Sequence, residues 1–94
     1  MDVDALRRSL ADADPPAGLA GPVQALWFAA KGDWQRAHVA VQSDESPAAA
    51  WVHAYLHRVE GDLSNARYWY RRAERAPATG ALDAEWSVIA AALL

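Results

Sequence analysis

The chain has 94 residues, a formal net charge of −3 and no cysteine, which indicates one small domain without disulfides or thiolate metal sites. The negative charge argues against general affinity for nucleic acid, and Asp2 and Asp4 are unlike the opening of a signal peptide. Because the apolar runs are too short to span a bilayer, we expect a soluble cytoplasmic protein with no membrane or nucleic-acid partner.

The first predicted helix runs from Asp2 to Ala11 and is followed by a proline-rich break. Its apolar residues recur with helical spacing at Val3, Leu6 and Leu10. The stretch Asp14–Gly18 ends it, because proline cannot continue a helix and restricts the residue before it. We therefore expect residues 1–20 to form a helix and a linker that are loosely attached to the rest.

The next two predicted helices are joined by a Gly-Asp corner. The first covers residues 21–31, with Pro22 in the tolerated first turn. Gly32 is suited to the left-handed position after a helix, and Asp33 is a favourable N-cap for the helix over residues 34–42.

A second pair of predicted helices follows. Ser46 before a proline is a strong start signal for a helix over residues 47–60. Gly61 and Asp62 form another corner, and the fifth helix covers residues 63–76. The apolar faces of the two helices comprise Trp51, Val52, Tyr55, Leu56 and Val59, and then Leu63, Ala66, Trp69, Tyr70, Ala73 and Ala76.

The last predicted helix lies within residues 78–94, after the breaks at Pro77 and Gly80. Its apolar stripe consists of Leu82, Trp86, Ile89 and Leu93. Such a stripe must dock on another surface, so this helix is expected to cap the hairpins of residues 21–77. The whole chain, residues 1–94, is then a single helical domain.

The two corners repeat one motif at a separation of 29 residues. Gly32–Asp33 followed by Ala37 recurs as Gly61–Asp62 followed by Ala66. Glycine allows the left-handed turn, aspartate binds the freed N–H groups, and alanine lets two helices approach closely. Internal repeats on this scale indicate stacked helical hairpins.

This pattern resembles the tetratricopeptide (TPR) repeat. The matching positions are Ala54, Gly61, Ala66, Tyr70, Ala73 and Pro77 in the second unit, and Ala25, Phe28, Gly32, Ala37 and Val41 in the first. The first unit lacks the large residue expected near Asp44, and the repeat is shorter than the usual ~34 residues, which argues against regular superhelical stacking. The resemblance implies an all-α fold of about six helices in TPR-like antiparallel hairpins, forming a short right-handed solenoid or bundle.

A second resemblance covers roughly Leu26 to Arg75. Residues 26–38 read LWFAAKGDWQRAH, and residues 53–73 read HAYLHRVEGDLSNARYWYRRA. Both stretches are similar to a family of small uncharacterised microbial and fungal proteins. This resemblance implies no activity, cofactor or partner.

One group of residues has the pattern of a ligand site. His53, His57 and Glu60 are spaced to lie along one side of a helix, and His38 lies on the helix expected to pack beside it. Two histidines one turn apart can chelate a first-row metal, with the carboxylate as a third ligand. The stronger interpretation is structural, with half-buried histidines bonded to Glu60, Asn65 or a tyrosine hydroxyl. The sequence thus predicts no cofactor, with a divalent metal as the alternative.

Two groups of residues are candidates for partner binding. Trp51, Tyr55 and Arg58 fall where the TPR resemblance places a concave groove, unless the last helix fills that groove. Tyr68 is expected to point toward Arg71 and Arg75, or else to be a lone surface tyrosine. The basic face that holds these arginines, if it is not simply solvated, is suited to an acidic peptide or a phosphate and comprises Arg67, Arg71, Arg72 and Arg75.

No catalytic residue is predicted, because the serines lie outside any nucleophile-elbow context and no glycine-rich phosphate loop is present. The leading hypothesis is a non-enzymatic, TPR-like interaction or scaffold module that binds a protein, a peptide or a second copy of itself. The alternative is a metal- or small-ligand-binding protein, with catalysis left open, that uses the His/Glu group. A third hypothesis is a protein that functions only within a larger assembly.

Overall fold

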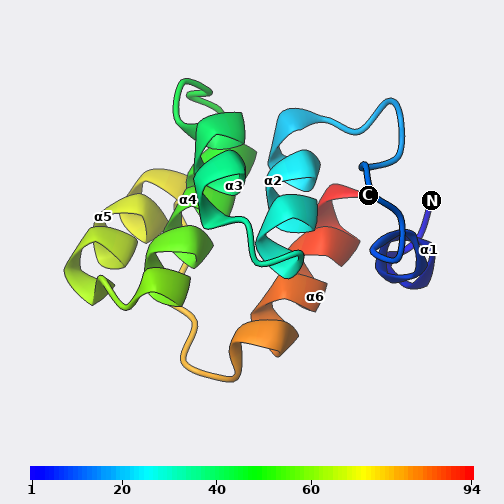
Figure 1. The fold of residues 1–94 in the computed structure, drawn as a ribbon. Helices are drawn as coiled ribbons and strands as arrows, with labels where there is room; N and C mark the ends of the chain where they lie inside the picture. The colour runs from blue at the N-terminus through cyan, green and yellow to red at the C-terminus, as the bar shows by residue number, and fades with distance from the viewer.

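Six helices and no strands make up this computed structural model, which describes all 94 residues (Figure 1). The helices are α1 (Val3–Ser9), α2 (Gly21–Ala30), α3 (Trp34–Val41), α4 (Pro47–Glu60), α5 (Leu63–Ala73) and α6 (Leu82–Leu93). The predicted all-α class is therefore confirmed. None of the helices combines the length and the apolar sequence that crossing a membrane requires.

The two Gly-Asp corners form as predicted and create the hairpins α2–α3 and α4–α5. Gly32 and Gly61 adopt left-handed backbone conformations, with φ of 79° and 85°. The carboxylates of Asp33 and Asp62 each accept a hydrogen bond from the backbone N–H three residues later, at 3.1 and 3.2 Å. Helix α5 ends at Ala73 rather than near residue 76, because Glu74 takes up a left-handed conformation.

Helix α4 is the centre of the molecule. Every residue from Ala49 to His57 is buried, because α2, α3, α5 and α6 all pack against this helix. The polar side chains within this buried stretch are therefore enclosed by neighbouring helices, where unpaired polar atoms are costly.

Helix α6 fills the groove that the TPR resemblance implies along α4. Trp86 is buried and its indole N–H donates to the carbonyl of Leu26 at 2.7 Å, while Ile89 is fully buried between the helices. Trp51 and Tyr55 are each only 6% exposed. These two predicted partner contacts thus belong to the core.

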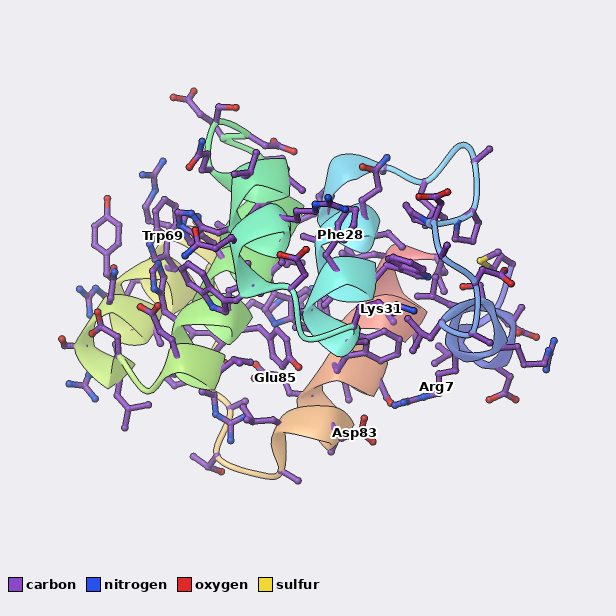
Figure 2. The ribbon with its side chains drawn as sticks, in the orientation of Figure 1. Arg7, Phe28, Lys31, Trp69, Asp83 and Glu85 are labelled. Carbon is purple, nitrogen blue, oxygen red and sulfur yellow. The ribbon has the colours of Figure 1, made fainter.

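Helix α1 is docked firmly on α6, so the expectation of a loosely attached arm is wrong. Leu6 is fully buried, and the Arg7 guanidinium donates to Asp83 at 3.1 Å and to the hydroxyl of Ser87 (Figure 2). The same guanidinium lies 4.6 Å from the centre of the Trp86 ring. The proline-rich linker therefore connects a docked helix to α2. Figure 1 shows α1 at the end of the molecule opposite α5.

Candidate functional site

The three histidines of the chain converge where α3 packs on α4, and we call His38, His53 and His57 the His cluster. The Nε2 atoms of His38 and His53 lie 2.9 Å apart. One ring nitrogen from each of the three histidines lies within 4.8 Å of the other two. The structure thus brings these three side chains together at one interhelical location.

Local structure explains why the rings meet. His53 and His57 are one turn apart on α4, so their rings stack with centroids 4.9 Å apart. His38 comes from α3, which is held on α4 by a hydrogen bond from the Trp34 indole N–H to the carbonyl of Leu56, at 2.7 Å. The Gly32–Asp33 corner sets the start of α3 and thereby the position along the α4 axis at which His38 contacts that helix.

Two tryptophans enclose the His cluster. The Trp69 ring, which extends from α5 (Figure 2), stacks on His53 with centroids 3.8 Å apart and an interplanar angle of 9°. Trp34 stacks on His38 at 4.8 Å and meets the edge of His57 at 5.9 Å. These flat contacts restrict the orientation of the imidazole planes and exclude water from their faces.

Glu60 and Asn65 surround His57 on its outer side. The Nδ1 atom of His57 lies 3.0 Å from a carboxylate oxygen of Glu60, and the Asn65 side-chain nitrogen lies 3.3 Å from Nε2. A carboxylate that accepts from Nδ1–H leaves Nε2 with its lone pair, which can either accept from the Asn65 amide or bind a metal. Asp62 also lies close enough to form a group with His57 and Glu60, although its carboxylate already caps α5.

Burial favours the uncharged forms of His38 and His53. Desolvation lowers the pKa of His53 to about 4, with smaller contributions from the positive charges of His38, His57 and Arg72. Desolvation, followed by the charge of His57, also lowers the pKa of His38, against the opposing effect of Glu60. Neutral imidazole is the form that can donate a lone pair to a metal.

His53 leaves one buried polar atom without a partner. Its Nδ1 atom is inaccessible to solvent and makes no hydrogen bond, and no other buried side-chain nitrogen or oxygen is left in this way. The contact between His38 and His53 needs a donor on one ring and an acceptor on the other. Whichever tautomer His53 adopts, its Nδ1 remains an unmatched donor or acceptor, which costs stability.

A second buried polar group, which the sequence analysis missed, lies between α4, α5 and α6. We call Arg58, Tyr70 and Glu85 the Glu85 cluster. Arg58 donates to Glu85 at 2.9 Å and also to the carbonyl of Gly80, and the Tyr70 hydroxyl donates to the second oxygen of Glu85. The signal was available, because Glu85 lies within the apolar stripe of α6, where a charge implies a buried partner.

The remaining predicted contacts do not form one surface. Tyr68 is exposed, but its hydroxyl accepts from Arg72 at 3.2 Å rather than meeting Arg71 and Arg75 as expected. Arg75 instead lies over the ring of Trp51, with its guanidinium carbon 3.7 Å from the ring centre. The structure thus separates Tyr68 from Arg75 and joins Arg75 to a tryptophan of another helix.

Comparison with known proteins assigns this chain to no family. No protein-family model matches the chain, no curated protein matches it, and no solved structure matches it. The proposals below therefore depend on the residues themselves.

Proposed function

We propose that this protein binds a first-row divalent transition metal through His38, His53 and His57. The observation that carries the proposal is the convergence of three ring nitrogens within 4.8 Å of one another. Zinc–imidazole bonds are about 2.0–2.1 Å long, so two nitrogens around one tetrahedral ion lie about 3.3 Å apart. The 2.9 Å separation of the His38 and His53 Nε2 atoms is already close to that spacing.

The protonation of the site suits this role. The proton shared between His38 and His53 occupies the position that a cation would take, and both rings have lowered pKa values. The Glu60 carboxylate orients His57 from outside, as carboxylates commonly do for metal-bound histidines. Three imidazoles are a ligand set for zinc, nickel, cobalt or copper, and the fourth position would be taken by water.

A purely structural role accounts less well for the same residues. Metal–ligand bonds would stabilise three adjacent imidazoles more strongly than the single hydrogen bond that joins two of them.

The test is calorimetric titration of the untagged protein with Zn²⁺ and Ni²⁺, together with the absorption spectrum of the Co²⁺ form. We expect one ion per chain and the visible bands of nitrogen-coordinated Co²⁺. His38→Gln should weaken binding by at least tenfold, because it removes one ligand and His38 is only half-buried. Glu74→Gln, which alters an exposed carboxylate outside the cluster, is the control. Absence of heat and of a Co²⁺ spectrum in the unmodified protein overturns the proposal.

A second candidate function is the TPR-like interaction or scaffold role expected from the hairpins, in a cytoplasmic protein. The observation that favours it is a set of four exposed arginines without a carboxylate partner within salt-bridge distance, namely Arg67, Arg71, Arg72 and Arg75. An unneutralised basic face on a chain of net charge −3 is complementary to an acidic partner. Light scattering over a concentration series tests whether that partner is a second copy, and a strict monomer removes this option.

A further inference from the structure

A half-open groove of about 390 Å³ lies between α4, the segment that follows α5, and α6. Small residues form its walls, Trp51 of α4 lies at its base, and Val88 of α6, which is 60% exposed, stands at its rim. Alanine and glycine walls let the backbone of a ligand approach closely. The size and the mainly apolar lining are those of a site for one or two apolar side chains.

Arg75 lies at the edge of this groove in a position that leaves its hydrogen-bonding groups free. Its guanidinium lies over the Trp51 ring, with the guanidinium carbon 3.7 Å from the ring centre. The side chain of Arg75 takes part in no hydrogen bond or salt bridge. Stacking uses the face of the guanidinium and leaves its N–H donors available at the edge. Because the stack already restricts the side chain, little further ordering is needed to bind a carboxylate.

The charges around the groove favour an acidic ligand. Residues 63–77 contain four arginines and one carboxylate, Glu74, which forms no salt bridge. Glu85 also lines the groove, but its carboxylate is neutralised by Arg58 and accepts from Tyr70. The free charge at this end of the molecule is therefore positive.

We propose that the groove binds an acidic peptide, which inserts one apolar side chain beside Trp51 and places an adjacent carboxylate on Arg75. This inference rests on the interaction role given above as the second candidate function. It names the partner as a short segment with a large apolar residue between acidic residues. The apolar groove selects a large apolar residue at the centre of the segment, and the guanidinium of Arg75 selects an acidic residue next to it.

The probe is a fluorescein-labelled peptide of sequence Glu-Asp-Glu-Leu-Glu-Asp-Glu, and its binding is followed by fluorescence anisotropy at low salt. A second peptide carries serine in place of the leucine. We expect the leucine peptide to bind at least tenfold more tightly than the serine peptide, and Arg75→Gln to weaken its binding about tenfold. Ala84→Trp, at an exposed position of the groove wall, should block binding by filling the groove.

The control variant is Arg8→Gln, which removes another exposed arginine without a salt bridge, on α1 at the far end of the molecule. It should leave binding unchanged. The indole N–H resonance of Trp51 should shift when the leucine peptide is added, which reports occupancy of the groove directly.

Two other results would distinguish the groove proposal from the wider role of binding an acidic partner. If both peptides bind equally and Arg67→Gln/Arg71→Gln weakens binding while Ala84→Trp does not, the basic face binds acidic partners and the groove proposal is wrong. If neither peptide binds and the Trp51 resonance stays in place, both the groove proposal and the acidic-partner role are wrong.

Discussion

The His cluster and the Glu85 cluster are both buried, both include side chains of α4, and differ in how their polar atoms are satisfied. In the Glu85 cluster the carboxylate of Glu85 accepts one hydrogen bond from the Arg58 guanidinium, at 2.9 Å, and another from the Tyr70 hydroxyl. Its charge is therefore neutralised and both of its oxygens have a partner. Burial and the bond to Glu85 raise the pKa of Tyr70. In the His cluster burial favours the neutral forms of His38 and His53, and one nitrogen has no partner.

This difference indicates different roles. A matched polar network rigidifies the fold and costs stability when one member is removed. An incompletely matched group reduces stability in the unliganded protein, and the convergence of three ring nitrogens, rather than the unmatched one, gives a reason for retaining it. On this argument the Glu85 cluster fixes α6 on the second hairpin, whereas the His cluster is the place to look for a ligand.

Glu85→Leu gives the largest expected effect on stability. The substitution leaves the buried guanidinium of Arg58 without its anion and removes the acceptor of Tyr70, which should lower the free energy of unfolding by about 3–5 kcal/mol. Urea denaturation followed by tryptophan fluorescence measures it. Asp83→Asn is the control, because its ion pair with Arg7 is largely exposed and should contribute at most ~1 kcal/mol. Equal losses in the two variants would contradict the role given to the Glu85 cluster.

Acidification should act on the His cluster. The pKa of His53 is about 4 in the folded chain and 6.5 in the reference state, so between these values the unfolded chain binds more protons. Stability is therefore complete above pH 6.5 and falls as the pH decreases toward 4, by about 3 kcal/mol from this group. His38, whose pKa is also lowered, should add to the loss in the same direction.

Urea titrations at pH 7, 5.5 and 4.5 measure this dependence. In His53→Phe the slope of unfolding free energy against pH should decrease, because that variant has no ring to protonate. A slope unchanged by the substitution would show that other groups, such as the carboxylates, cause the acid sensitivity.

Metal binding should stabilise the protein through the His cluster alone. With free Zn²⁺ at 100 times its dissociation constant, the free energy of unfolding should rise by about 2.7 kcal/mol, if the ion binds only the folded chain. Thermal denaturation monitored by circular dichroism gives this increment. Glu85→Leu should retain it, because the two clusters share no partner, and His38→Gln should lose it. An increment that survives His38→Gln would place the metal elsewhere.

Local signals made much of the fold predictable. The corners at Gly32–Asp33 and Gly61–Asp62 depend on the backbone freedom of glycine and the capping of the next helix by aspartate, and both properties are readable over four residues. The relation of His53 to His57 is equally local, because it follows from helical periodicity. That His38 belongs with them required the expectation that the second helix of one hairpin packs beside the first helix of the next.

Long-range pairing was not readable in the same way. Leu6 and Arg7 are ordinary residues of a short helix until α6 lies beside them, and their partners are distant in sequence. Trp51 was assigned to an open groove because its burial depends on where α6 docks. The stacking of Arg75 on Trp51 depends in turn on the early end of α5 at Glu74, a left-handed position that no glycine marks.

His53→Phe gives the smallest expected effect on stability and the sharpest contrast with Glu85→Leu. Both substitutions place an apolar side chain at a buried polar position, but phenylalanine keeps the stacking surface on Trp69 and removes the one unmatched buried nitrogen. His38, which loses its partner, is half-buried and within reach of water. We therefore expect the unfolding free energy at pH 7 to stay within ~1 kcal/mol of the unmodified protein. Urea denaturation checks this value, and calorimetry on the same sample should show that Zn²⁺ binding is lost. A loss of stability near that of Glu85→Leu would mean that the His cluster supports the fold as the Glu85 cluster does, which would contradict the different roles given to the two clusters.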